Sequence, residues 1–246
     1  MKVVSGHQPV YLPWLGLLHK ASLADVFIQM DDVQYLEKDW NNRNKIKTSQ
    51  GKEQWLTVPV DLKSSASNLL KDIRIFQEPG PVARRWQARH WTALQSCYGK
   101  APFFAQYRPF FEDLYLGRTW ESLAELNLAI LKQAFAWFNV SAEIVLASTQ
   151  GFTGKKSDLV LEHAVRFKAD VVVTGALGKD YIREDDFRAK GVRVRFQDYK
   201  HPTYEQRFGG FLPRLSFVDL LFQHGPASPE IAFAENWTRE DLCRPE

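Results

Sequence analysis

Short apolar runs recur along the chain and predict the strands of a buried sheet. The run at 25–30 (Asp-Val-Phe-Ile-Gln-Met) and the β-branched run at 169–174 have the length and composition of strands that are covered on both faces. Similar patterns predict further strands at 2–6, 55–60, 73–76, 143–147 and 192–196.

Longer amphipathic segments between these runs predict helices at 15–23, 81–98, 119–139, 156–168 and 183–190. Pro81 suits the first turn of a helix, because its missing N–H needs no partner there. Thr119 is the expected N-cap of the helix at 119–139, and Ser157 that of the helix at 156–168.

The alternation of strands and helices predicts an α/β fold with a mainly parallel, Rossmann-like sheet and covering helices. We expect the helical block at 81–139 to be an insert or a lid over the strand ends. Residues 1–226 make up the predicted domain, and the Pro-rich, polar tail at 227–246 is expected to be ordered in part.

Composition excludes several classes of protein. The net charge of +3, without a run of Lys or Arg, argues against a nucleic-acid-binding surface. Cys97 and Cys243 lie far apart, match no metal or redox motif and are typical of a reducing compartment. Polar and proline residues interrupt the first apolar residues by Gln8, so we expect no secretory leader. No apolar stretch approaches the roughly 18 residues of a membrane span. We therefore expect a cytoplasmic protein without membrane insertion.

Polar and aromatic side chains gather where the first predicted strand meets the first helix. The segment at 6–21 carries His7, Gln8, Tyr11, Trp14 and His19. Open α/β sheets bind ligands outside the carboxyl ends of their strands, so we expect these side chains to face a ligand. The alternative is a rigid loop, stiffened by two prolines, whose histidines are ordinary polar partners.

Two adjacent carboxylates, Asp31 and Asp32, follow the strand at 25–30, and Asn42 and Arg43 come shortly afterwards. A carboxylate at a strand end can hold Mg²⁺ together with a substrate phosphate, and Arg43 can bind that phosphate bidentately. The alternative, which we favour for Asp31, is that the two carboxylates cap the next turn and Arg43 pairs with one of them. For Asp32 the two interpretations are equally weighted.

A third cluster, Gly178-Lys179-Asp180-Tyr181, follows the strand at 169–174. Backbone N–H groups beside a lysine and an acid can bind an anion and handle a proton at one place. Such turns also occur for steric reasons, and Tyr181 is equally suited to the core.

A fourth cluster lies at 201–206. Tyr204 and Gln206 alternate with their neighbours as the side chains of a strand do, so a hydroxyl and an amide share a face that suits recognition of a sugar. His201 is held extended because Pro202 follows it. The alternative is a Tyr204–Gln206 pair that closes an edge strand.

Several familiar motifs are absent. The segment at 151–157 resembles a phosphate loop but has Thr149 where the motif requires glycine. The chain also lacks a Gly-x-Gly-x-x-Gly fingerprint, zinc-ligand spacing and a Gly-x-Ser-x-Gly nucleophile elbow. No metal ligands are assigned, and the cofactor is left open, with Mg²⁺ at Asp32 as the one candidate.

The quoted motifs, taken together, resemble the WbqC-like family over about residues 3–226. The matching segments are His7-Gln8-Pro9-x-Tyr11-Leu12-Pro13-Trp14-Leu15-Gly16, Asp31-Asp32-Val33-Gln34-Tyr35, Asn42-Arg43-Asn44, Gly178-Lys179-Asp180-Tyr181 and His201-Pro202-x-Tyr204-x-Gln206-x-Phe208. The resemblance implies a bacterial protein from gene clusters for O-antigen or other surface polysaccharides. It points to nucleotide-sugar or amino-sugar metabolism without naming a reaction.

The first strand, the histidine loop and the first helix also resemble, more distantly, HIGH-type nucleotidyltransferases and pantothenate synthetases. In those families histidines stabilise phosphates in the transition state. Here His7 and His19 are twelve residues apart, and no Lys-Met-Ser-Lys-Ser-like signature follows. This second likeness therefore concerns the fold.

These features favour a transferase that acts on a nucleotide-activated or phosphate-bearing substrate. His7 would stabilise charge or move a proton, Arg43 and Lys179 would hold phosphate, and Asp32 would hold Mg²⁺ or act as a base. Tyr204 and Gln206 would orient the acceptor. The alternatives are a non-catalytic protein that binds a nucleotide sugar or a pathway partner, and a structural subunit with an aromatic interface at 86–111. The sequence does not decide whether the protein forms a homo-oligomer.

Overall fold

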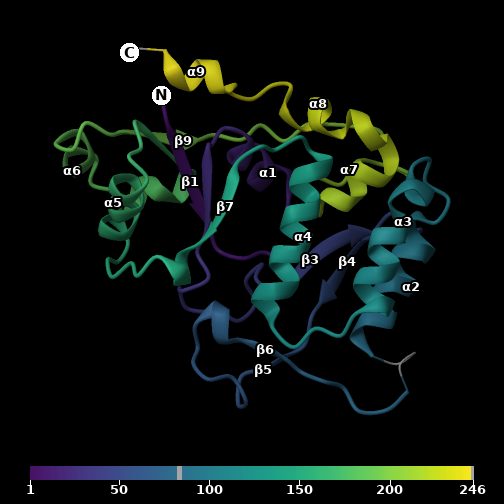
Figure 1. Cartoon of the computed structure of the whole chain (residues 1–246). Coiled ribbons are helices and arrows are strands. Elements are labelled where there is room, and N and C mark those ends of the chain that lie inside the picture. Colours follow the sequence, from purple (N-terminus) through teal and green to yellow (C-terminus); the bar gives the residue numbers. More distant parts are fainter. Residues whose placement is uncertain (82–84, 245–246) are drawn as a thin grey trace.

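A five-stranded, fully parallel sheet forms the centre of the computed structural model in Figure 1, which describes residues 1–81 and 85–244. The spatial order of its strands is β7-β2-β1-β8-β9. Their bounds are Val3–His7 (β1), Val26–Gln29 (β2), Glu143–Leu146 (β7), Val171–Gly175 (β8) and Arg193–Gln197 (β9). The predicted α/β fold with a parallel sheet is confirmed.

The order of the strands reverses at β1. From β1 the chain first builds outward through β2 and β7, and then crosses to the other side of β1 to add β8 and β9. The β1–β8 ladder ends at the pair Ser5↔Val173, whereas the β1–β2 ladder continues to His7↔Gln29. The two central strands therefore part at their carboxyl ends, at a topological switch point where sheets of this kind bind ligands.

Helices cover both faces of the sheet. The helices of the described residues are α1 (Leu15–Ser22), α2 (Trp86–Tyr98), α3 (Phe104–Glu112), α4 (Leu123–Trp137), α5 (Ser157–Arg166), α6 (Glu184–Arg188), α7 (Phe217–His224), α8 (Ser228–Phe233) and α9 (Arg239–Cys243). Short 3₁₀ turns lie at Leu70–Asp72, Ala147–Thr149, Ala176–Asp180 and Gly225–Ala227, and a π-helical turn at Asp113–Gly117. In Figure 1, α5 and α6 lie on one side of the sheet and α4 and α7 on the other.

Two small antiparallel hairpins lie outside the main sheet. The first pairs β3 (Arg43–Lys47) with β4 (Glu53–Thr57), and the second pairs β5 (Val60–Asp61) with β6 (Arg74–Ile75). The strand predicted at 55–60 is thus divided between β4 and β5, because the chain leaves the first hairpin before Pro59. β3 was not predicted.

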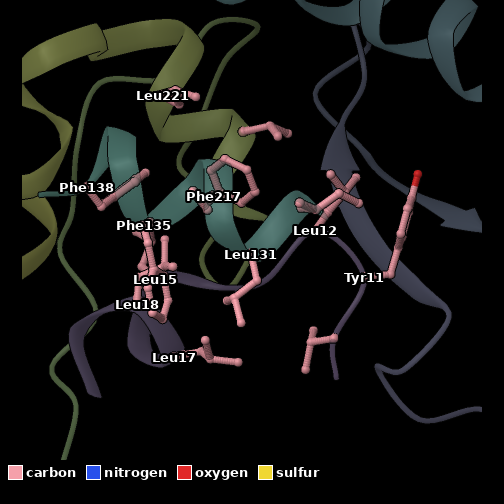
Figure 2. Close-up of a cluster of buried hydrophobic side chains, with 14 of the residues drawn as sticks. Tyr11, Leu12, Leu15, Leu17, Leu18, Leu131, Phe135, Phe138, Phe217 and Leu221 are labelled. Carbon is pink, nitrogen blue, oxygen red and sulfur yellow. The ribbon is translucent and has the colours of Figure 1, made fainter. Parts of the chain in front are cut away.

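The larger core lies on the face covered by α1, α4 and α7. Figure 2 shows side chains from these three helices meeting there, with Leu15 and Leu18 beside Phe135 and Phe138 and with Phe217 close by. The smaller core lies under α5 and α6 and is built from short residues such as Val4 and Ala164. Alternating strand residues feed the two cores, as a sheet covered on both faces requires.

Most predicted elements of the sheet and its helices are present, with shifts at their ends. Residues 201–206 form no strand. The helix at 119–139 begins later than predicted, because the hydroxyl of Ser122, not that of Thr119, accepts the Glu125 N–H as the N-cap. Lys156 is the N-cap residue of α5, so Ser157 opens the helix instead of capping it.

The helix predicted from Pro81 begins at Trp86, and residues 82–84 of that prediction lie outside the described residues. The segment predicted to be a partly ordered tail contains α8 and α9, the latter with a capping box between Thr238 and Asp241. Arg239 at the start of α9 forms an ion pair with Asp25, next to β2. No helix of the described residues is long and apolar enough to cross a membrane.

Candidate functional site

His7 ends β1 at the topological switch point. Its Nδ1 lies 2.9 Å from the carbonyl oxygen of Gln8. A carbonyl only accepts, so Nδ1 carries the proton and Nε2 carries the lone pair. Burial, with a smaller contribution from the charge of Lys20, lowers the pKa of His7 to about 3. His7 is therefore a neutral imidazole at pH 7, held edge-on against Trp14 with ring centroids 5.1 Å apart.

Lys20 of α1 also reaches the carboxyl end of β1. Its side chain is buried, with only 4% of the residue exposed, and its Nζ donates to the Gly6 carbonyl at 2.9 Å. Gly6 lies beyond the last β1–β8 pair, so the amine is at the point where these strands part. Burial lowers the pKa of Lys20 to about 7. Among the described residues, no carboxylate forms an ion pair with it.

A set of four side-chain amides adjoins His7, and we call it the amide cluster: Gln8, Gln29, Asn41 and Asn127. Gln29 is the register partner of His7 on β2, so both side chains leave the same face of the sheet. The Asn41 amide donates to the Gln8 side chain at 3.3 Å, and the Asn127 amide donates to the Asn41 carbonyl at 2.8 Å. Both amide atoms of Gln29 are buried without a protein partner, as are the side-chain oxygens of Asn41 and Asn127.

The two carboxylates after β2 have different surroundings. Asp31 is buried and accepts from the N–H and the hydroxyl of Ser148 at 2.9 and 2.7 Å, which ties the end of β2 to the end of β7. Asp32 is half-buried, and its Oδ1 has no partner. Burial, together with the charge of Asp31, raises the pKa of Asp32. Neither carboxylate pairs with Arg43 in the described structure. Because Asp31 is bonded to Ser148, Asp32 is the carboxylate with an oxygen left to bind a ligand.

The loop after β8 places Lys179, Asp180 and Tyr181 on the other side of the switch point. Lys179 and Asp180 are exposed. Tyr181 is 38% exposed and lines a small, partly open pocket of about 40 Å³, which Gly6 and His163 of α5 also line. Nε2 of His163 has no partner, and burial lowers the pKa of His163 to about 4. A space of this size holds one small molecule at most, such as water.

Two residues predicted to face a ligand, Tyr11 of the first loop and His19 of α1, have protein partners instead. The hydroxyl of Tyr11 is buried against Nδ1 of His90 at 2.8 Å and the hydroxyl of Tyr115. His19 receives a hydrogen bond from the Gln197 amide at 2.7 Å and donates through Nε2 to the Trp237 carbonyl at 2.9 Å. Both side chains lie within the protein interior and connect distant segments.

Tyr204 and Gln206 belong to a buried network around Asp219 of α7. The Asp219 carboxylate accepts from the hydroxyls of Tyr98 and Tyr204 at 2.8 and 2.9 Å and from the Gln206 amide at 2.8 Å. Lys47 completes it, donating to the Gln206 side chain at 3.2 Å and to the carbonyls of residues 209 and 210. We call these five residues the Asp219 network. The polar groups of this network bond to one another, and none of the hydrogen bonds described above joins it to His7.

Three other predicted residues hold loops and strands in place. Asn42 donates to the Val58 carbonyl at 2.8 Å. His201 contacts the Pro202 carbonyl at 2.8 Å through Nδ1 and accepts the Arg214 N–H at 3.1 Å through Nε2. Arg43 donates to the Lys38 carbonyl and stacks 4.4 Å from the centre of the Trp55 ring. Its Nε has no partner.

The structure thus brings His7, Gln8, Trp14, Asp32 and the Lys179 loop to the carboxyl edge of the sheet. Sequence reasoning missed Lys20, Gln29, Asn127 and His163. Lys20 falls within the segment at 6–21, but a lysine in a helix normally points to solvent, and no pattern marked its burial. Among the described residues, no group of three or more His, Cys, Asp or Glu side chains is arranged to hold a metal ion.

The fold and the site define an α/β protein with a candidate ligand site at the switch point of a parallel sheet. The sequence model of the WbqC-like protein family matches residues 8–231, and the chain belongs to this family. It is 32% identical over 231 residues to the uncharacterized protein Rv1507c of Mycobacterium tuberculosis, a match that covers 94% of this chain and 97% of that protein. No solved structure matches the chain.

Proposed function

We propose that the protein is a transferase that acts on a phosphate-bearing, nucleotide-activated sugar at the carboxyl ends of β1 and β8. One observation carries the proposal: Lys20 is buried at the switch point beside the neutral His7, and within the described part of the chain its amine bonds to one group, the Gly6 carbonyl. A buried amine that lacks a carboxylate has unused capacity to bind an anion. Strongly perturbed pKa values of two adjacent groups also favour a functional site over a structural one.

The two residues supply complementary chemistry. A bound phosphate favours the charged form of Lys20, because an opposite charge nearby raises the pKa of an amine. The ammonium then stabilises the negative charge that develops on the leaving phosphate. The lone pair on Nε2 of His7 accepts the proton of the attacking hydroxyl or amine. Phosphate bound beside His7 also raises its pKa, which makes it a better base in the complex than in the free protein.

Other groups at the edge of the sheet support the same substrate class. Lys179 adds a second, exposed cation on the β8 side, and Trp14 provides a half-buried ring next to His7. Asp32 offers a free carboxylate oxygen for Mg²⁺ or for an acceptor amine. The link to surface-polysaccharide or amino-sugar biosynthesis is part of this proposal.

Thermal unfolding with a panel of nucleotides and nucleotide sugars, with and without Mg²⁺, tests the proposal. A ligand at about a hundred times its Kd adds about 2.7 kcal/mol of stability, which raises the melting temperature. We expect such a rise for the wild type, its loss in Lys20→Met, and its retention in Lys132→Met, which changes an exposed lysine of α4. No rise with any member of the panel would contradict the proposal.

Turnover separates an enzyme from a binding protein. With the nucleotide sugar that binds, we expect release of the nucleotide when candidate acceptors are added, and its loss in a cooperatively folded His7→Ala variant. Binding without turnover across a broad set of acceptors, with His7→Ala binding as well as the wild type, would favour the non-catalytic binding protein.

A further inference from the structure

Three of the four residues of the amide cluster have buried polar atoms that no protein group satisfies. Gln29, Asn41 and Asn127 are each about 1% exposed. Both amide atoms of Gln29 lack a partner, and so do the side-chain oxygens of Asn41 and Asn127. Buried polar atoms nearly always have a hydrogen-bond partner, and each exception requires an explanation. The explanation is of interest here because the cluster adjoins His7.

The orientation of the amides is determined by their neighbours. The Asn41 nitrogen donates to the Pro9 carbonyl at 2.9 Å, and the Asn127 nitrogen donates to the Asn41 carbonyl at 2.8 Å. Backbone carbonyls only accept, so turning either amide around would place oxygen against oxygen. The free atoms of Asn41 and Asn127 are therefore oxygens. With Gln29 the cluster offers three unused acceptors and one unused donor.

The three unpaired acceptors and one unpaired donor indicate which kind of ligand the cluster can bind. A phosphate or carboxylate brings only acceptors and would face three oxygens. A hydroxyl both donates and accepts, and an amide N–H donates. A neutral ring with several hydroxyls, or with an acetamido group, fits the unused capacity of the cluster. The ammonium of Lys20, by contrast, suits the anion, so the two halves of the site have different preferences.

The fold places these residues at the same edge of the sheet. Gln29 shares a face with Phe27, whose ring packs 5.5 Å from that of Phe135 in α4. α4 leads directly into β7, which is parallel to β2, so the amino-terminal half of α4 lies toward the carboxyl ends of the strands. Asn127 is in that half, two turns before Phe135.

We infer that the amide cluster is the sugar-recognition half of the site, with Gln29 and Asn127 binding hydroxyl or acetamido groups of the substrate. The inference rests on the proposed function, because it assumes that the phosphate lies at Lys20. It goes further in assigning specificity for the sugar to the face covered by α4 and not to the β8 loop. A site built to hydrogen-bond a hydroxyl strongly rejects an analogue that lacks it.

The test compares matched ligands on matched variants. The ligands are UDP against UDP-N-acetylglucosamine, GDP against GDP-mannose, and the free monosaccharides at millimolar concentration. The variants are Gln29→Leu and Asn127→Leu, with Asn44→Leu as a control. Asn44 is also a buried amide, but both of its side-chain atoms have partners, in Leu12 and Lys45.

Binding is measured by titration calorimetry, and free monosaccharides are followed by saturation-transfer NMR. We expect the sugar moiety to strengthen wild-type binding about tenfold over the diphosphate alone. Gln29→Leu and Asn127→Leu should lose that gain and leave diphosphate binding within about twofold. If all variants retain the gain, or if the sugar adds nothing, the inference is overturned while the phosphate site at Lys20 stands.

Melting temperatures of the free proteins provide a second measurement. Gln29→Leu removes unsatisfied atoms, so its melting temperature should equal or exceed that of the wild type, whereas Asn44→Leu should melt lower. A lower melting temperature for Gln29→Leu, with unchanged sugar binding, would show that the amides are structural. A monosaccharide that binds without any diphosphate binding, and whose binding Gln29→Leu abolishes, would support the amide cluster and rule out the phosphate site at Lys20. If neither class binds, both are overturned.

Discussion

Two lysines are buried in the part of the chain that the structure describes, and their surroundings differ. Lys47 is 1% exposed, and its Nζ donates to the Gln206 side chain and to the carbonyls of residues 209 and 210. Lys20 is 4% exposed, and its Nζ donates to the Gly6 carbonyl. A charge that is buried and fully bonded stabilises the arrangement around it, whereas one with unused donors is free to bind a ligand. We therefore assign Lys47 to the fold and Lys20 to the site.

The largest difference is expected when each lysine is replaced by methionine. Lys47→Met leaves the buried Asp219 without its nearby cation and removes the donor from two carbonyls and Gln206. Breaking a buried charged network in this way costs about 3–5 kcal/mol of unfolding free energy. Urea unfolding at pH 7 measures it, with Lys132→Met as the exposed control. If Lys47→Met lowers the unfolding free energy by less than about 1 kcal/mol, the assignment of Lys47 to the fold is wrong.

The second prediction concerns pH and Lys20. The pKa of Lys20 is about 7 in the folded protein and 10.5 ordinarily, so folding disfavours its charge. This cost is complete below about pH 7 and is relieved as the pH rises toward 10.5, where both states are neutral. Relative to Lys20→Met, the wild type should gain about 2–4 kcal/mol between pH 6.5 and pH 10. Urea unfolding of both proteins at several pH values measures this gain. A difference that does not change with pH would contradict it.

Three buried histidines should make the protein less stable at acidic pH, with a smaller effect for each residue than that of Lys20. The pKa values of His7 and His90 are lowered to about 3 and that of His163 to about 4, in each case mainly by burial. The unfolded chain binds protons at these residues below about pH 6.5, so stability falls as the pH drops from 6.5 toward 4. Each histidine contributes about 1.4 kcal/mol per pH unit to this slope.

His163→Gln isolates one of these contributions. Nε2 of His163 has no partner, so the substitution breaks no hydrogen bond at that atom. The slope of unfolding free energy against pH between 6 and 4.5 should decrease by about 1 kcal/mol per unit. An unchanged slope would mean that His163 is protonated in the folded protein.

The smallest effect is expected for Lys179→Ala. The side chain is exposed, near the ring of Phe196, with 5.9 Å between Nζ and the ring centre. Stability should change by less than about 0.5 kcal/mol. Affinity for the nucleotide should fall about twofold to fivefold, and the loss should shrink at high salt because the charge is screened. A loss as large as that of Lys20→Met would move the phosphate to the β8 side.

The strands and helices of the sheet were largely predictable, and the role of polar residues was not. The apolar runs at 25–30 and 169–174 became β2 and β8 because a strand buried on both faces needs apolar residues at nearly every position. The alternation at Tyr204 and Gln206 had no such requirement. Those residues lie in a loop without strand structure, and their polar groups bind Asp219.

The sequence by itself determined the class of fold, the junction after β1 as a place of interest, and the family. These depend on local pattern and on motifs that a chain carries in any conformation. Which polar side chains remain free was decided by tertiary structure alone. His19 is satisfied only because Gln197 and Trp237 reach it from distant segments. Lys20 bonds to the Gly6 carbonyl and keeps donors to spare because no carboxylate of the described residues pairs with it. Hydrogen bonding and desolvation act between residues far apart in the chain, so these contacts decide which groups are able to bind a ligand.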